Sequence, residues 1–217
     1  GWLEKTRERL SSFLPQPPEL RTRPNILHEV VQALEERPKI VILDFGGGAG
    51  LDYLHLATTL AGQSEFDHHV VDAEAVINIG RKELGGCPGL HFHSSLPELS
   101  RVDVVHLGSS LQYIDDWRAL LSTLSAYDAP LMLLSDVFAG DIDSFVSLQN
   151  VWGRKIPFRF LNERELTDHI ESLGYVLTRR VPFKGTVCGT NEVLPMHNLP
   201  AERRLEHTLH LLFEKRS

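Results

Sequence analysis

The hydrophobic pattern over the first two thirds of the chain alternates between short apolar runs and longer stretches with helical spacing. The short runs predict strands at 39–45, 67–72, 90–93, 102–107 and 130–135. The longer stretches predict helices at 2–13, 25–36, 51–60, 73–84 and 117–124. Strands that alternate with helices at this spacing indicate βαβ units and a mainly parallel sheet. Because such crossovers are right-handed, the helices cover both faces, as in a doubly wound, Rossmann-like α/β fold.

The pattern changes after Asp136. Residues 136–150 are polar and irregular, with room for one short helix. A clear helix is predicted over 162–173, with Asn162 as its N-cap and Glu165 at the N3 position. Two further strands are predicted, at 175–183 and 208–213. The loop between these two strands has more than 20 residues, and loops of that length in compact domains are usually functional or disordered.

Length and composition narrow the class of protein. The chain has 217 residues, of which 42% are hydrophobic and 24% charged, and this suits one α/β domain. We expect residues 1–37 to form an N-terminal helical segment and 38–217 a single domain, with a cap-like insertion at about 137–161. No apolar run approaches the ~20 residues that cross a bilayer, and no signal-peptide pattern is visible. We therefore expect a cytoplasmic protein without a membrane partner.

Charge and cysteine content limit the partners. A net charge of −7 argues against nonspecific binding to nucleic acid, which needs a positive field. The two cysteines, Cys87 and Cys188, lie 101 positions apart and form neither a metal-type spacing nor a disulfide framework. A small-molecule substrate is expected, no nucleic acid, and a homodimer is left open.

A glycine turn follows the first predicted strand. Residues 44–50 read DFGGGAG, and glycines are needed where the backbone takes a positive φ or approaches a ligand closely. In a doubly wound sheet this turn lies in the crevice where cofactors bind. Dinucleotide sites use G-x-G-x-x-G, which fails here because Leu51 and Tyr53 stand where the last glycine is needed. The acidic-x-Gly-x-Gly-x-Gly spacing favours a cofactor without a pyrophosphate; the alternative is a plain glycine-rich turn.

Two further segments are candidates for cofactor contacts. Asp72 ends the second predicted strand, 28 residues after Asp44, where a carboxylate can accept hydrogen bonds from ribose hydroxyls; the alternative is an N-cap for the next helix. Ser94 and Ser95, followed by Leu96, come after the third strand. They could meet an adenine ring, or they could form a plain solvated turn.

These residues carry a resemblance. Asp44–Gly50, Asp72 and the segment at 107–116 resemble the motifs of class I S-adenosylmethionine-dependent methyltransferases, with Tyr113 where many relatives carry an aromatic residue or His. More narrowly, FGGGAG, SSLQY and RKIPFRFLNE resemble a bacterial family assigned as methyltransferases whose members often sit among surface-polysaccharide genes. The resemblance covers roughly residues 15–215. It implies S-adenosylmethionine as the cofactor and a seven-stranded sheet in the order 3-2-1-4-5-7-6 with the seventh strand antiparallel.

The cofactor-binding residues expected on this basis are Asp44, Gly46, Gly48, Gly50, Asp72, Ser94, Ser95, Gly108 and Ser109. Methyl transfer needs mainly alignment of donor and acceptor, and an oxygen acceptor usually also needs a base. The candidate catalytic residues are Tyr113, which could instead be an aromatic packed against Trp117, and Asp136, which could instead cap a turn. His106 is expected to be a buried, hydrogen-bonded core residue. No His or acidic spacing indicates a metal site, so no metal is expected.

The segment at 152–160 is the predicted substrate cap. Its aromatic and basic side chains could stack on rings and hold phosphates or carboxylates, and we single out Trp152, Arg154 and Phe158 as substrate-binding. An oligomer contact or a packed crossover is the alternative. The sequence thus predicts a methyltransferase acting on a small molecule, by O-methylation of a sugar or nucleotide-sugar-like metabolite. The alternatives are a non-catalytic S-adenosylmethionine-binding scaffold and, less favoured, an NAD-type oxidoreductase.

Overall fold

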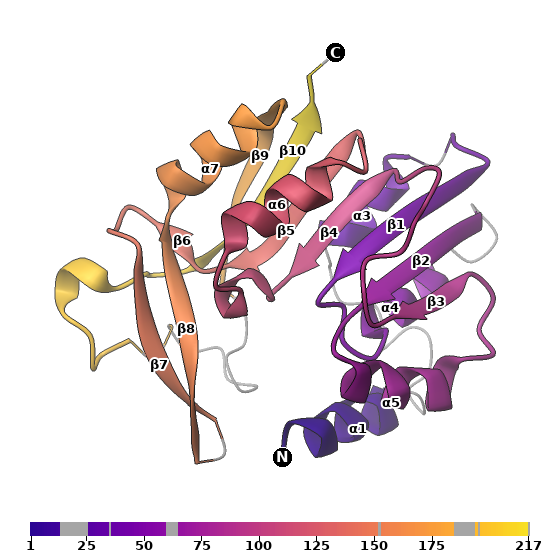
Figure 1. Cartoon of the computed structure of the whole chain (residues 1–217), viewed down its shortest axis with the longest axis horizontal. Helices are drawn as coiled ribbons and strands as arrows, with labels where there is room; N and C mark the ends of the chain where they lie inside the picture. Colours follow the sequence, from indigo (N-terminus) through magenta and orange to yellow (C-terminus); the bar gives the residue numbers. More distant parts are fainter. Residues whose placement is uncertain are drawn as a thin grey trace. The chain divides into compact units, whose positions relative to one another are not determined.

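A computed structural model describes residues 1–13, 26–34, 36–59, 65–151, 153–184, 194 and 196–216. The chain divides into two compact units, residues 1–107 and 108–217, and each is described by itself (Figure 1). Trp152 and Cys188, as well as the predicted start of the helix at 25–36, lie outside the described residues. In the described part of the chain, no helix has both the length and the apolar character needed to cross a membrane.

The first unit is built on parallel strands. Strand β1 (Lys39–Phe45) pairs with β2 (Glu65–Val71) on one side and with β4 (Val104–Gly108) on the other. Strand β3 (Leu90–His93) pairs with β2. The helices of this unit are α1 (Trp2–Phe13), α3 (Ile26–Gln32), α4 (Leu51–Thr59) and α5 (Glu74–Leu84). The predicted strand at 39–45 and helix at 2–13 are confirmed residue for residue, whereas α3 is shorter than the predicted helix at 25–36.

One face of β2 and β3 packs against helices. Val70, Leu90 and Phe92 lie in an apolar cluster with Tyr53 and Leu54 of α4, Ile79 and Leu84 of α5, and Leu10 of α1. Because side chains alternate between the two faces of a strand, the odd-numbered side chains of β2 and β3 point to the opposite face. The connection from β3 to β4, residues 94–103, contains no helix, although a parallel crossover usually does.

The second unit contains antiparallel strands and two helices. Strand β10 (Thr208–Lys215) lies between β5 (Leu131–Val137) and β9 (Tyr175–Phe183) and is antiparallel to both. The helices are α6 (Trp117–Ser125) and α7 (Glu163–Ser172), with short 3-10 turns η1 (Leu111–Tyr113) and η2 (Ala201–Arg203). A small sheet is formed by β6 (Ala139–Gly140), β7 (Phe145–Val151) and β8 (Arg154–Asn162), and β7 and β8 make a long hairpin (Figure 1).

The prediction of an irregular segment with one short helix at 136–150 is wrong. Strands β6 and β7 occupy this segment instead. Along β7 every second side chain is exposed, including Val146 and Leu148, and the strand pairs with β8 over its whole length. The sequence pattern hides the strand because its apolar residues fall on both faces. Pairing with β8 satisfies the backbone, so the alternation of apolar and polar residues need not be strict.

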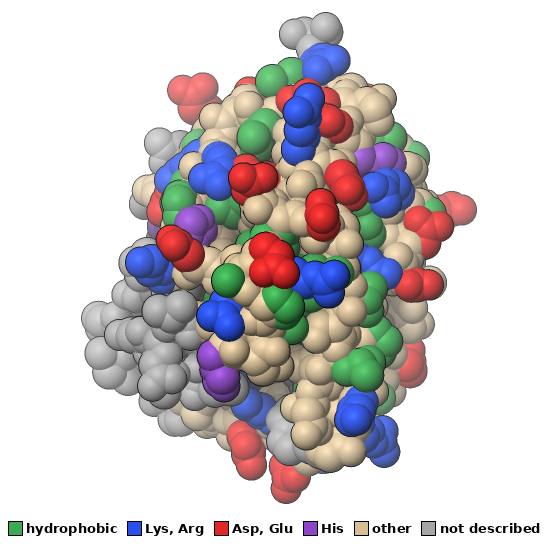
Figure 2. Space-filling view, turned by 90° about the vertical axis from the view of Figure 1, so that its left-hand side faces the viewer, with side chains coloured by type: hydrophobic (Ala, Val, Ile, Leu, Met, Phe, Trp, Pro, Cys, Tyr) green, Lys and Arg blue, Asp and Glu red, His purple; other side chains and the backbone are tan. Residues whose placement is uncertain are grey.

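Charged side chains of both signs are mixed on the face of the second unit that Figure 2 shows. Ion pairs in this unit join Arg118 to Glu165 (3.2 Å) and Arg180 to Glu163 (2.5 Å).

The predicted strand order is confirmed. The large sheet has the order β3-β2-β1-β4-β5-β10-β9, which is 3-2-1-4-5-7-6 when its seven strands are numbered along the chain. The last strand, β10, is the antiparallel one. The Rossmann-like α/β fold class follows from this order.

The first turn of helix α7 is capped by a side chain. The Asn162 side-chain oxygen accepts a hydrogen bond from the Glu165 N–H (2.9 Å), and its amide donates to the Ile142 carbonyl (2.9 Å). The predicted N-cap is therefore confirmed. We expect Asn162→Ala to lower the free energy of unfolding by about 1 kcal/mol, because it leaves a first-turn N–H without its partner.

Urea denaturation measures this effect. Asn162→Asp keeps the cap and loses only the Ile142 bond, so its stability should lie between those of the wild type and Asn162→Ala. An alanine variant as stable as the wild type would contradict the assignment.

Candidate functional site

The glycine turn after β1 has the backbone that its sequence predicts. Gly46, Gly48 and Gly50 have φ values of 76°, 63° and 86°, a left-handed conformation that side chains with a Cβ rarely adopt. A Cβ added at Gly48 would meet no atom within 4 Å. The space beside Gly48 is therefore open, and close approach of a ligand to this backbone is sterically possible.

The fourth glycine of the turn, Gly47, is required for a different reason. A Cβ at this position would lie 2.2 Å from Oδ2 of Asp44. Asp44 is fully buried, and its two oxygens are 2.9 Å from Nε2 of His68 and 2.8 Å from Nδ1 of His106. These imidazoles come from β2 and β4, the two strands that flank β1. The Asp44 carboxylate thus lies beneath the turn and fixes its position.

Electrostatics agree with this arrangement. Burial alone would raise the pKa of Asp44, but the charge and hydrogen bond of His106, together with His68, outweigh it and hold the pKa well below its usual range. The expectation that His106 is a buried, hydrogen-bonded residue is confirmed. Asp44 and His106 also lie near Asp52 in a group that could hold a metal ion. We assign Asp44 and His106 to each other, because a hydrogen-bonded carboxylate–imidazole pair accounts for the burial of both.

Asp72 reaches the same turn from the end of β2. Its Oδ2 accepts from the Gly48 N–H (2.9 Å) and its Oδ1 from the Ala73 N–H (2.6 Å). Helix α5 begins at Glu74, with Ala73 at the N-cap position and no capping hydrogen bond from a side chain, so the alternative role of Asp72 as N-cap is not what the structure has. A carboxylate has about four lone-pair positions, so two backbone hydrogen bonds leave capacity for two hydroxyl groups.

Ser94 and Ser95 lie on the exposed segment that follows β3. A hydrogen bond from Ser94 contributes most to the lowered pKa of Glu74, which is at the start of α5. The two serines and Asp72 follow neighbouring strands, β3 and β2, whose carboxyl ends meet at one edge of the sheet. The predicted cofactor residues of the first unit therefore lie along a single edge.

The second unit holds the remaining candidates, at the ends of β4 and β5. Gly108 ends β4, and Ser109 follows it with a φ of 49°. Asp136, near the end of β5, has a φ of 55°. Neither is a glycine, and strained backbone of this kind clusters at functional sites. The Ser109 N–H donates to the Ser135 carbonyl (2.9 Å), so the two positions are held next to each other.

The carboxyl group of Asp136 has partners on β10. Its Oδ1 accepts from the Thr208 hydroxyl (2.6 Å), and its backbone N–H donates to Nδ1 of His210 (3.0 Å). Burial raises the pKa of Asp136 and outweighs the opposing hydrogen bonds from Thr208 and Ser109. A carboxylate with a raised pKa is a stronger base than an exposed one. Sequence reasoning missed Thr208 and His210, because no local motif marks them and only the pairing of β10 with β5 brings them here.

Tyr113 is not packed against Trp117. Its ring meets Phe158 edge-on at 5.4 Å, and its hydroxyl donates to Oε1 of Gln149 (3.1 Å). The side chain is 43% exposed, and the pKa of its hydroxyl is raised by burial. Trp117 instead has its edge-to-face ring contact with His169. Tyr113 thus presents an aromatic surface to solvent from a position fixed by β7 and β8.

The predicted substrate cap is partly an apolar core. Phe158 is 6% exposed and belongs to a cluster with Phe138, Phe145 and Phe160. Arg154 lies on the exposed side of β8. Of the residues predicted to bind substrate, Arg154 is therefore accessible in the structure, whereas Phe158 supports Tyr113 from within.

The buried pair under the turn leads to a prediction about pH. Burial lowers the pKa of His106, but the charge and hydrogen bond of Asp44 outweigh it and raise the pKa. The folded chain then binds this proton more tightly than the unfolded chain. The resulting stabilisation is present below the unfolded-state pKa of about 6.5 and is lost as pH rises through the folded-state value.

We therefore expect the stability difference between the wild type and His106→Gln to shrink as pH rises from about 6 to about 9. Urea denaturation at each pH measures it. His197→Gln, on an exposed turn of the second unit, controls for the loss of a histidine. A difference that stays constant over this range would show that the proton on His106 does not stabilise the fold.

Comparison with known proteins gives a clear result for the fold. No protein-family model and no curated protein matches the sequence. Solved structures do. The 1,6-didemethyltoxoflavin-N1-methyltransferase of Burkholderia thailandensis, with bound 1,6-didemethyltoxoflavin and S-adenosylhomocysteine, has 18% identity and a TM-score of 0.57 over 88% of this chain and 76% of that one.

Two more solved structures agree. An S-adenosylmethionine-dependent methyltransferase from Clostridium acetobutylicum has 12% identity and a TM-score of 0.55 over 88% of this chain and 90% of that one. The glycopeptide N-methyltransferase MtfA, complexed with sinefungin, has 12% identity and a TM-score of 0.55 over 88% and 86%. The chain therefore has the fold of S-adenosylmethionine-dependent methyltransferases.

Proposed function

We propose that this chain is an S-adenosylmethionine-dependent methyltransferase that acts on a small molecule. The observation that carries the proposal is the turn after β1, where three glycines adopt positive φ and Asp72 reaches the backbone of the middle one. The structural likeness to methyltransferases supports the same reading. NAD-type chemistry is disfavoured, because the turn lacks the third glycine of the dinucleotide spacing.

The residues of the first unit fit this cofactor. The open space beside Gly48 admits the methionine part, and the start of α4 offers backbone N–H groups to its carboxylate. The remaining lone pairs of Asp72 can accept from the ribose hydroxyls. Ser94 and Ser95 follow β3, where the adenine would lie. Asp44 supports these groups from below, since both of its oxygens are bonded to imidazoles.

The residues of the second unit fit an acceptor. When bound, S-adenosylmethionine supplies an activated methyl group on a sulfonium, so the protein has to align the acceptor and remove its proton. Asp136 has the raised pKa of a base, and Thr208 fixes its carboxyl group. Tyr113 offers a half-exposed ring that can orient the acceptor. We assign the base to Asp136 and the orienting role to Tyr113.

The acceptor we propose is a hydroxyl of a sugar or of a nucleotide-sugar-like metabolite. The exposed ring of Tyr113 suits stacking on a sugar, and exposed Arg154 suits a phosphate or carboxylate. The resemblance to a bacterial family found among surface-polysaccharide genes supports the same substrate class. Hydroxyl groups are weak nucleophiles and need a base, a role that the half-buried Asp136 carboxylate can take.

Calorimetric titration with S-adenosylmethionine, S-adenosylhomocysteine and NAD tests the cofactor. We expect the first two to bind and NAD not to bind. Asp72→Ala should weaken binding of S-adenosylhomocysteine at least about tenfold, because loss of a charge-assisted hydrogen bond costs on the order of 1.5–3 kcal/mol. Gly48→Val should weaken it by at least about as much, because its side chain fills the open space beside the turn and strains a positive-φ backbone.

Asp143→Ala, at an exposed site of the second unit, is the matched control and should bind normally. Binding of NAD alone, or of none of the three, would overturn the proposal. Normal binding by both site variants would overturn the assignment of the turn.

Turnover tests Tyr113. With nucleoside-diphosphate sugars as probes, release of S-adenosylhomocysteine reports methyl transfer. We expect Tyr113→Ala to lower kcat by at least about tenfold while affinity for S-adenosylhomocysteine stays within about twofold, because an orienting residue acts on the reacting geometry. Tyr113→Phe keeps the ring and loses only the Gln149 bond, so it should lie between. Equal losses of turnover and affinity would identify Tyr113 as a packing residue.

A further inference from the structure

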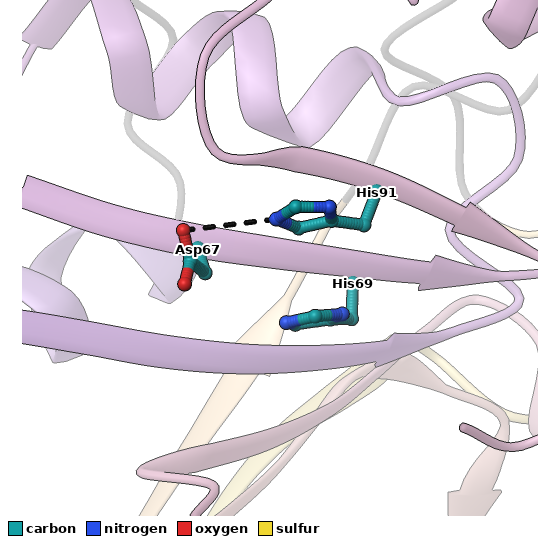
Figure 3. A group of neighbouring side chains, drawn as sticks. All are labelled: Asp67, His69 and His91. Atoms are coloured by element: carbon teal, nitrogen blue, oxygen red, sulfur yellow. Dashed lines mark ion pairs between the residues drawn. The ribbon is translucent and has the colours of Figure 1, made fainter. Parts of the chain in front are cut away.

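A cluster of imidazoles lies on the face of the sheet opposite the α4–α5 core. Asp67 and His69 of β2 share this face with His91 and His93 of β3, since His69 pairs with His91 in the parallel register. Ligand atoms of Asp67, His69 and His91 all lie within 4.8 Å of one another. Figure 3 shows the His69 and His91 rings extending side by side from neighbouring strands toward Asp67.

The geometry of the group is that of a ligand set. The rings of His69 and His91 are stacked, with centroids 4.5 Å apart and planes inclined by 17°. Nε2 of His91 is 3.7 Å from Oδ1 of Asp67. In a tetrahedral zinc site, bonds of about 2.0–2.1 Å place neighbouring ligand atoms about 3.3 Å apart. Small side-chain rotations are therefore enough to bring one ligand atom of each of the three residues to bonding distance of a single ion.

His93 completes the arrangement from behind. Its Nε2 is 3.0 Å from Nδ1 of His69. In the tautomer of His69 with the proton on Nδ1, this N–H donates to His93 and the lone pair of His69 lies on Nε2. A metal-binding histidine almost always donates its other ring N–H to a partner in this way, which fixes its tautomer and orientation. His93 thus prepares His69 for an ion without binding the ion itself.

Burial affects the pKa values of two of these imidazoles, His69 and His93. Burial, followed by the neighbouring His91 and His93, lowers the pKa of His69 to about 4. Burial likewise lowers the pKa of His93. The ring of His69 stacks on both neighbours, with centroids 4.5 Å from His91 and 5.3 Å from His93.

One cation already lies at the edge of the cluster. The Lys39 ammonium is 2.7 Å from Oδ2 of Asp67 and is 48% exposed. It occupies the oxygen that does not face His91, so an ion on Oδ1 is compatible with it. Its positive charge opposes a second cation nearby. Removing that charge should therefore strengthen metal binding, which no structural role of the histidines would predict.

The cluster is reached from solvent at His91, whereas His69 is only 9% exposed. Residues 94–103 join β3 to β4 without a helix, and His91 is 44% exposed. Strand β3 has only four residues and lies at the end of the sheet. An ion held by side chains of both β2 and β3 would fasten this short strand to its neighbour.

We propose that Asp67, His69 and His91 form a three-ligand binding site for a divalent transition-metal ion, with His93 as the outer partner of His69. Three nitrogen and oxygen ligands on adjacent strands are the donors that zinc accepts. The site fastens β3 and thereby the segment that carries Ser94 and Ser95. The sequence predicts no metal site, because these ligands are spread over two strands and only the register between the strands brings them together.

Zinc sulfate is the probe, used with the full chain carrying no polyhistidine tag and stripped with a chelator. Competition with a chromogenic chelator gives the stoichiometry and affinity. We expect one zinc ion per chain. Affinity should fall at least about tenfold in His91→Gln and in Asp67→Asn, and rise about two- to fivefold in Lys39→Gln. Zinc should raise the Tm of the wild type and leave that of His91→Gln unchanged.

His197→Gln and Asp52→Asn are the controls, the first for loss of any histidine and the second for the group around Asp44. Both should bind zinc as the wild type does. Thermal unfolding without metal shows whether each variant folds. Absence of zinc binding in the wild type, wild-type affinity in His91→Gln, or an equal loss in Asp52→Asn would each overturn the proposal.

Discussion

The buried carboxylate of Asp44 constrains both the glycine turn and the strands around it. A charge without contact to water needs partners for both of its oxygens, and Asp44 finds them in imidazoles from the strands on either side of its own. Asp44 on β1 is thus hydrogen-bonded to both neighbouring strands, β2 and β4, directly below the glycine turn. The same carboxylate leaves no room for a side chain at Gly47. The acidic residue and the glycine three positions later are therefore required together.

The sequence was sufficient for elements whose signal is local. Strand β1 is a continuous apolar run and was predicted to the residue, and α7 was predicted from its N-cap. The strand order came from resemblance. The prediction for residues 136–150 was wrong, because β7 depends on pairing with β8 and not on an alternation of apolar and polar residues in its own sequence. An edge hairpin of this kind is specified by its partner strand.

The residues of the candidate site also divide into those that a local sequence motif marks and those that it does not. The glycine spacing and Asp72 could be picked out because they are contiguous or end a predicted strand. The pairing of His68 and His106 with Asp44, and the contacts of Thr208 and His210 with Asp136, could not be predicted, because each depends on the register between strands distant in sequence. Ser109 and Asp136 were chosen for their places at strand ends, but their left-handed backbone is not visible in a pattern of residue types. The pattern of residue types therefore predicts neither the register between strands distant in sequence nor a strained backbone conformation.

The outermost strands of the large sheet have a consequence for how copies of the chain meet. Strand β9 presents Arg179, Arg180 and Pro182 along its length, and β3 at the other end is only four residues long. Pro182 of β9 cannot donate a ladder hydrogen bond, and β3 is too short to pair over many residues. Each end strand therefore limits pairing with a second sheet edge over part of that edge.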